Sequence, residues 1–183
     1  LRADAAKVAQ WAPRLGEHAG ARVGIVWSGN PFHVNDRNRS VDFERFALLL
    51  GLTAGSVQFV SLQKEIRPAD QEALDACPAV LQVGSALADF GDTAAVCELL
   101  DLVITVDTSI AHLAGALGKP GWIMLPPNSD WRWLRDDSIC RWYPSGRLFR
   151  LHAQGEWEAV FERVAAELLT FVAATRPVEE RAA

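Results

Sequence analysis

Apolar and polar positions alternate along the chain in blocks that predict strands followed by helices. Nearly continuous apolar runs at Arg22–Trp27, Val57–Leu62 and Leu102–Val106 are typical of strands buried on both faces of a parallel sheet. Further strands are predicted at Val80–Val83, in the run that ends at Leu125 and at Leu148–Leu151. Helical spacing separates these runs at residues 3–18, Phe43–Leu50, Pro68–Leu74, Thr93–Leu100 (with Asp92 as its cap) and Trp157–Phe171. The pattern predicts an α/β, Rossmann-like doubly wound parallel sheet of about six strands.

The stretch Leu102–Leu125 carries the most specific pattern. Its apolar run meets a polar Asp-Thr-Ser cluster at 107–109, a small-residue helical pattern follows, and Gly-Lys-Pro at 118–120 ends that helix before the next apolar run. This is the order of a βαβ unit. Its strand-to-helix turn offers hydroxyls, a carboxylate and a helix N-terminus, which together suit a phosphate. We therefore expect a nucleotide or nucleotide-sugar site here.

His112 lies on the same helix, away from its predicted apolar stripe. That stripe contains Ile110, Leu113, Ala114 and Leu117. At about 100° per residue, His112 falls on the face of Thr108, four residues earlier. Thr108, Ser109 and His112 can then face one ligand beside Asp107. The alternative is that Asp107 is a helix cap and His112 a surface histidine.

Three other segments carry candidate chemistry. The polar loop 28–40 holds Arg37 and Arg39, whose guanidinium groups match phosphate oxygens, and Gly29, which permits a sharp turn; the alternative is a solvated surface loop. Lys64 follows the second strand, where it can reach a phosphate. The loop 126–144 contains three tryptophans that either stack a base or sugar ring or fasten the loop to the sheet: Trp131, Trp133 and Trp142.

Missing motifs and bulk composition exclude several classes. The chain has no GxGxxG in its first βα turn and no GxxxxGK[ST], which disfavours dehydrogenases and P-loop ATPases. A formal charge of −5 over 183 residues argues against a general nucleic-acid or membrane-surface binder, and no run of about 18 apolar residues predicts a membrane span. Three scattered cysteines indicate free thiols in a reducing, cytoplasmic setting rather than a zinc site. Because residue 1 is Leu, we expect a piece of a longer protein.

Two sets of residues resemble a known family. VDTSIAHLAGALGKP at 106–120 resembles the nucleotide-sugar motif of the heptosyltransferases of glycosyltransferase family 9. The span 23–168, with VGIVWSGNP, NDRNRS, FVSLQKE, LADFGDTAA and DWRWL, is similar to the C-terminal glycosyltransferase-like portion of bacterial tetratricopeptide-repeat proteins. The chain departs from the heptosyltransferase pattern at Ser109-Ile110, where those enzymes usually have Gly-Pro, so ADP-heptose is not assumed as the donor.

The resemblance implies one half of a GT-B architecture, the half that binds a nucleoside diphosphate sugar without a metal. It implies that Asp107, Thr108, Ser109 and His112 hold the diphosphate and ribose. Further phosphate or sugar contacts are expected from Gly29, Asn30, Arg37, Arg39 and Lys64, and base contacts from Gln82, Val83 and Gly84. The expected organisation is a leading helix or linker at 1–20, the nucleotide-sugar domain at 21–175 and a disordered tail at 176–183. Expected partners are the sugar donor, the N-terminal GT-B half and tetratricopeptide repeats, and no nucleic acid.

The sequence therefore predicts the donor half of a glycosyltransferase that moves a sugar to an acceptor hydroxyl, inactive without its other half. Two alternatives remain at this point. One is a non-catalytic interaction domain that retains the fold without the chemistry. The other is a nucleotide-sugar epimerase-like domain of the same architecture.

Overall fold

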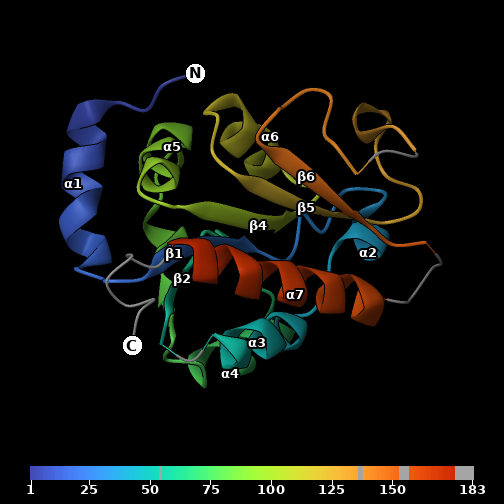
Figure 1. Ribbon diagram of the computed structural model, residues 1–183, viewed down its shortest axis with the longest axis horizontal. Coiled ribbons are helices and arrows are strands. Elements are labelled where there is room, and N and C mark those ends of the chain that lie inside the picture. The colour runs from blue at the N-terminus through green and yellow to red at the C-terminus, as the bar shows by residue number, and fades with distance from the viewer. Residues whose placement is uncertain (54, 136–137, 153–156, 176–183) are drawn as a thin grey trace.

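Six parallel strands form one sheet in the order β3-β2-β1-β4-β5-β6 (Figure 1). The computed structural model describes residues 1–53, 55–135, 138–152 and 157–175. The strands are β1 (Ala21–Val26), β2 (Val57–Ser61), β3 (Val80–Gln82), β4 (Leu102–Val106), β5 (Gly121–Leu125) and β6 (Gly146–Arg150). This order is that of a doubly wound Rossmann-like sheet. The predicted fold class and strand number are confirmed.

Helices cover both faces of the sheet, as a sheet of buried parallel strands requires. One face carries α1 (Ala5–Leu15), α5 (Phe90–Glu98) and α6 (Ser109–Ala116), and the other carries α3 (Phe43–Leu52), α4 (Pro68–Asp75) and α7 (Trp157–Thr175) (Figure 1). The larger core lies under α3, α4 and α7, where Trp27, Phe43 and Phe46 are fully buried. The smaller core joins α1 to α5 and α6, with Trp11 and Leu15 buried.

Two local expectations are wrong. Helix α5 begins at Phe90, because Asp89 rather than Asp92 is its N-cap and accepts a hydrogen bond from the Asp92 N–H at 2.9 Å. The Asp92 carboxylate instead accepts from Lys7 on α1 at 2.8 Å, and this contact with the ammonium lowers the pKa of Asp92 to about 2. The loop after β1 also contains a short helix, α2 (Asp36–Arg39), which the sequence pattern did not predict.

The strand order reverses between β1 and β4, and this switch point positions the site. The two strands pair in parallel, with Ile25 opposite Ile104 and Val26 opposite Thr105. The helices that follow them leave toward opposite faces of the sheet, so the loops after β1 and β4 diverge and open a crevice. Ligands of open α/β sheets bind in such a crevice at the carboxyl ends of the strands.

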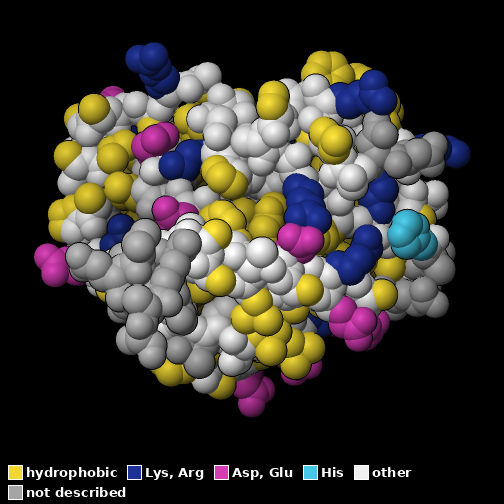
Figure 2. All heavy atoms as spheres, viewed as in Figure 1, with side chains coloured by type: hydrophobic (Ala, Val, Ile, Leu, Met, Phe, Trp, Pro, Cys, Tyr) yellow, Lys and Arg dark blue, Asp and Glu magenta, His cyan; other side chains and the backbone are white. Residues whose placement is uncertain are grey.

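The three cysteines are free: Cys97 and Cys140 are buried, and Cys77 is half-buried. Burial raises the pKa of the Cys97 thiol to about 12, so it stays protonated. Over the face seen in Figure 2, Lys and Arg side chains lie among acidic and hydrophobic ones. None of the helices in the described part of the chain is both long and apolar enough to cross a membrane. The predicted tail at 176–183 lies outside the described residues.

Candidate functional site

The turn between β4 and α6 is capped by Thr108, not by Asp107. The Thr108 hydroxyl accepts a hydrogen bond from the Ile110 N–H at 3.3 Å and lies 3.1 Å from the hydroxyl of Thr105. Ser109 is therefore the first helical residue, and its side chain is exposed at the positive end of the helix dipole. Two expectations are confirmed here: the turn starts a helix, and it presents a hydroxyl to solvent.

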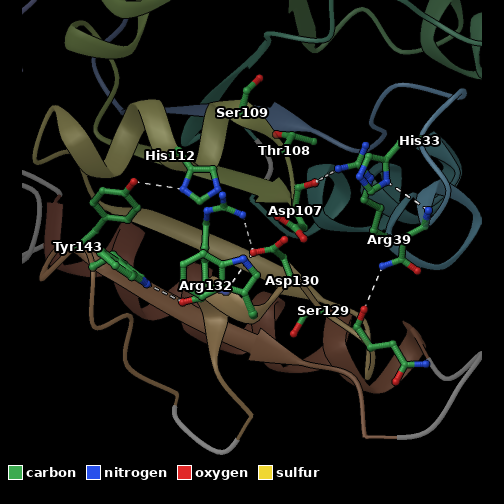
Figure 3. A pocket seen from close by; sticks show the side chains of 14 residues that line it. His33, Arg39, Asp107, Thr108, Ser109, His112, Ser129, Asp130, Arg132 and Tyr143 are labelled. Atoms are coloured by element: carbon green, nitrogen blue, oxygen red, sulfur yellow. Dashed lines mark hydrogen bonds and ion pairs between the residues drawn. The ribbon is translucent and has the colours of Figure 1, made fainter.

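Asp107 links two loops. Its carboxylate is buried, with the residue 8 % exposed, and it accepts a hydrogen bond from the Trp133 indole Nε1 at 2.8 Å. Its backbone carbonyl accepts from Arg39 Nη1 at 2.7 Å. Figure 3 shows Asp107 between Arg39 on one side and His112 and Arg132 on the other. Asp107 thus holds the described part of the Trp-rich loop (residues 126–135 and 138–144) and the loop after β1 together.

Arg39 approaches this turn because Gly29 has no side chain. A Cβ at Gly29 would lie 2.4 Å from Arg39 Nη2, closer than real contacts allow. The Arg39 side chain is only 12 % exposed, and its Nε lies 3.5 Å from the Asp36 carboxylate. Asp36 also pairs with Arg67 and accepts from the Ser40 hydroxyl at 2.8 Å. The guanidinium is thus held in place beside the start of α6.

A buried glutamine fixes the loop after β1. The Gln63 Oε1 accepts from the N–H groups of Trp27 at 3.3 Å and Ser28 at 3.1 Å, and its Nε2 donates to the carbonyls of Ser28 and Glu65. Because both ends of the amide are used, the side chain sets the direction in which the chain leaves β1. The sequence places Gln63 and Lys64 at the end of the second strand but assigns chemistry only to Lys64; a glutamine at the end of a buried strand was the available signal.

His112 packs into an aromatic wall. Its ring stacks on Trp133 with centroids 4.7 Å apart. Its Nδ1 lies 3.1 Å from the Tyr143 hydroxyl, the contact drawn as a dashed line in Figure 3. Burial lowers the pKa of His112 below its usual value near 6.5, so the ring is neutral at pH 7. Gly115, one turn further along α6, makes room for this wall because a Cβ there would lie 2.2 Å from the Tyr143 ring. His112 is therefore half-buried rather than a surface histidine.

Two clefts meet at the start of α6. The tryptophan cleft, of about 710 Å³, lies under the Trp-rich loop and is lined by His112, Asn128, Asp130, Arg132, Trp131 and Trp142 among others. The Lys64 cleft, of about 620 Å³, lies on the β2 side and is lined by Gly29, Asn30, Lys64, Leu62, Leu87 and Ile110 among others. Arg39, Thr108 and Ser109 line both. We call these three residues the shared seat.

The structure divides the predicted site residues into four groups, three of which line cavities. Asp107, Thr108, Ser109, His112 and Arg39 surround the tryptophan cleft, while Gly29, Asn30 and Lys64 line the Lys64 cleft. Arg37 is exposed and lines a separate cavity of about 530 Å³ together with His152.

The residues predicted to meet a base line neither cleft. Gln82 is exposed, whereas Val83 and Gly84 are buried. A Cβ on Gly84 would lie 1.9 Å from the Gln63 carbonyl oxygen. Gly84 therefore permits close packing under the Gln63–Lys64 backbone, which itself lines the Lys64 cleft. No group of three or more His, Cys, Asp or Glu side chains among the described residues is placed to hold a metal ion.

No protein-family model matches the chain. Protein FlbA of Caulobacter vibrioides, whose name states no activity, is 32% identical over 178 residues. The match covers 94% of this chain and 29% of FlbA, so the chain spans less than a third of that relative.

A solved structure shares the fold of the chain. A glycosyltransferase family 9 protein from Veillonella parvula superposes with a TM-score of 0.60 at 16% identity, over 92% of this chain and 53% of that one. The wall teichoic acid polymerase TagF gives a TM-score of 0.49 at 10% identity, over 93% of this chain and 41% of TagF. The chain has the α/β fold found in about half of the family 9 protein.

Proposed function

We propose that this chain is the donor-binding half of a metal-independent GT-B glycosyltransferase. In this proposal it binds a nucleoside diphosphate sugar at the shared seat, and the complete enzyme transfers the sugar to an acceptor hydroxyl. The observation that carries the proposal is the position of the seat. The N-terminus of α6 and the guanidinium of Arg39 lie side by side at the switch point, where two clefts meet.

The seat suits a diphosphate for two physical reasons. The first turn of a helix has backbone N–H groups without intrahelical acceptors and carries a partial positive charge. Arg39 adds a full charge that is already oriented, because Asp36 and the Asp107 carbonyl hold its guanidinium. When the bond between sugar and diphosphate breaks, negative charge grows on the diphosphate. Fixed donors that already face it stabilise that charge without a metal.

The two clefts then take the two ends of the donor. The Lys64 cleft has apolar walls of Leu62, Leu87 and Ile110, which suit a nucleoside base, and Lys64 stands at its rim near the phosphates. Gly84 contributes by packing under the backbone of Gln63 and Lys64, two residues that line this cleft. The tryptophan cleft is richer in amide, hydroxyl and charged side chains, which suit sugar hydroxyls.

The fold of the family 9 protein supports this proposal, because the chain superposes on about half of it. A GT-B enzyme needs a second Rossmann-like half across the donor cleft. We therefore propose that the longer protein supplies this half, with the acceptor site, together with tetratricopeptide repeats, and that it works in the cytoplasm. These features lie beyond the present chain, which spans 29% of FlbA.

The proposal is tested by calorimetric titration of the chain with UDP, CDP, ADP and GDP, each with magnesium and with EDTA. We expect saturable binding of one nucleotide that is equal under both conditions. Arg39→Ala should weaken that binding by about tenfold or more, since a charged hydrogen bond to a phosphate contributes about 1.5–3 kcal/mol. Arg37→Ala is the matched control from the same loop and should leave it unchanged.

Two results would contradict the proposal. If Arg39→Ala binds as tightly as the native chain while keeping its thermal transition, the shared seat does not hold the phosphates. If no nucleotide binds this chain or a longer form that contains the preceding residues, the non-catalytic interaction domain becomes the better account.

A further inference from the structure

The three tryptophans of the Trp-rich loop do different things. Trp133 is 1 % exposed and fastens the loop to Asp107. Trp131 and Trp142 are 66 % and 56 % exposed and both line the tryptophan cleft. Fastening the loop therefore explains Trp133 but not the other two. Large aromatic side chains left in solvent at the wall of a cleft indicate a ligand contact.

Trp131 and Trp142 form a fixed corner. Their ring centroids are 6.2 Å apart and their planes meet at 81°. The Trp142 indole Nε1 donates to the Arg132 carbonyl at 2.8 Å, and the Arg132 guanidinium lies 4.7 Å from the centre of the Trp131 ring. Asp130 caps the short turn Trp131–Trp133 by accepting from the Arg132 N–H at 3.0 Å. The corner is thus ordered before any ligand arrives.

Polar groups surround the corner in the same cavity. The Asp130 carboxylate and the Arg132 guanidinium pair at 2.9 Å and remain 38 % and 47 % exposed at their side chains. Asn128 and Ser129 line the cavity beside them. A carboxylate, a guanidinium, an amide and a hydroxyl together offer several donors and acceptors. Hydroxyl groups both donate and accept, so a polyhydroxylated ligand can use all of them.

The angle between the rings selects the shape of the ligand. A flat base that stacks on one ring presents only its edge to the other, because the two planes meet at 81°. A saturated pyranose ring carries C–H bonds in several directions, and these can contact both aromatic surfaces. Its hydroxyls then point outward to the polar groups around the corner.

We propose that Trp131 and Trp142 form a pyranose-binding subsite, with Asp130 and Arg132 as its hydroxyl partners. This proposal rests on the proposed function in one respect, namely that the shared seat beside the corner binds the diphosphate of the donor. The ring belongs either to the sugar of the bound donor or to a carbohydrate acceptor, since both present the same chemistry. Either way, this corner selects which sugar the protein accepts.

The test compares Trp131→Ala and Trp142→Ala with Phe32→Ala, which removes an exposed aromatic ring that lines neither cleft. Each variant is titrated with UDP, ADP and GDP and with UDP-glucose, UDP-N-acetylglucosamine, ADP-glucose and GDP-mannose. Each is also examined with free methyl pyranosides by saturation-transfer NMR. Thermal transitions of all variants verify that they fold.

If the ring belongs to the donor, each tryptophan variant should weaken binding of the nucleotide sugar by about three- to tenfold, which is the effect expected from losing one aromatic contact. They should leave the matching nucleoside diphosphate unchanged. If the ring belongs to an acceptor, the nucleotide sugars keep their affinity, and the methyl pyranoside signals disappear in the tryptophan variants. Phe32→Ala should change neither sugar readout.

Three results would overturn the subsite. Equal weakening of the nucleoside diphosphate and its sugar conjugate would place a base, not a sugar, on the corner. Unchanged binding of every probe in both tryptophan variants would show that no ligand contacts the corner. The same conclusion would follow if the native chain gave no pyranoside signal and bound nucleotide sugars no better than their diphosphates. Absence of nucleotide binding in the native chain contradicts the proposed function instead, and the pyranoside measurement still tests the corner.

Discussion

The two clefts that meet at the shared seat are built in different ways. The Lys64 cleft is lined mainly by residues that directly follow β1 and β2 and by the starts of α5 and α6, all of which the sheet positions. The tryptophan cleft depends on a long loop held by Trp133, Tyr143 and Arg132. A cleft shaped by the sheet is fixed by the fold, whereas a cleft shaped by a loop can change without changing the fold. Specificity is therefore expected to reside in the loop.

Removing the Trp133 anchor should have the largest effect on stability, and it should disturb the tryptophan cleft more than the Lys64 cleft. Trp133→Ala leaves a large cavity and an unpaired Asp107 carboxylate, so it should lower the free energy of unfolding by about 3–5 kcal/mol. Trp133→Phe removes mainly the hydrogen bond and should cost about 1.5–3 kcal/mol. Urea denaturation measures both. Trp131→Ala, on the same loop but exposed, is the control and should stay within about 0.5 kcal/mol of the native chain.

The nucleoside diphosphate contacts should survive Trp133→Phe better than the sugar contacts do. If the variant instead unfolds the Lys64 cleft as well, with equal loss of protection from hydrogen exchange at β2 and at the Trp-rich loop, the two clefts are not independent.

Adding one methyl group at Gly29 should damage the seat that both clefts use. In Gly29→Ala the new Cβ would displace the Arg39 guanidinium, which lies 2.4 Å from that position. We expect about a tenfold loss of nucleotide affinity, equivalent to about 1.4 kcal/mol. Gly51→Ala is the matched control, because nothing lies within 4 Å of its Cβ in helix α3. It should leave affinity unchanged and stabilise the helix slightly. Equal affinity in Gly29→Ala would mean that Arg39 does not bind phosphate.

The pH dependence should be smaller and confined to the tryptophan cleft. Burial lowers the pKa of His112 in the folded chain, so the unfolded chain binds a proton more readily. The stability that neutral His112 provides is complete above pH 6.5 and declines as the pH falls toward its folded pKa. NMR titration of the imidazole should give a midpoint below 6.5. A midpoint above 6.5 would contradict the stacked, desolvated position on Trp133.

The fold could be predicted well because each strand and most helices depend on patterns among residues that are close in the sequence. Apolar runs placed all six strands, and the turn at 107–109 correctly marked the start of α6. The sequence leaves a cap at Asp107 open as an alternative, whereas the structure has Thr108 as the cap; both residue types cap helices, and only backbone geometry separates them. Helix α2 was missed because its four residues are too short to show a period.

The site was harder to predict because long-range contacts build it. Asp107 and Trp133 are far apart in the chain, and no spacing rule shows that a carboxylate and an indole will meet. Arg37 and Arg39 look equivalent in the sequence, yet they line different cavities because α2 turns them apart. The close contact of the Tyr143 ring with Gly115 depends on the same loop and could not be predicted from the sequence either.

The most direct test of the central claim is to place a negative charge in the shared seat. Ser109 is exposed at the first position of α6, so Ser109→Asp should interact favourably with the helix dipole and raise the free energy of unfolding by about 0.3–1 kcal/mol. The same charge should repel a diphosphate and abolish nucleotide binding, while the neutral Ser109→Asn keeps it. Calorimetric titration and urea denaturation of both variants measure these opposite effects. Undiminished nucleotide binding in a well-folded Ser109→Asp would contradict the claim that the start of α6 holds the diphosphate.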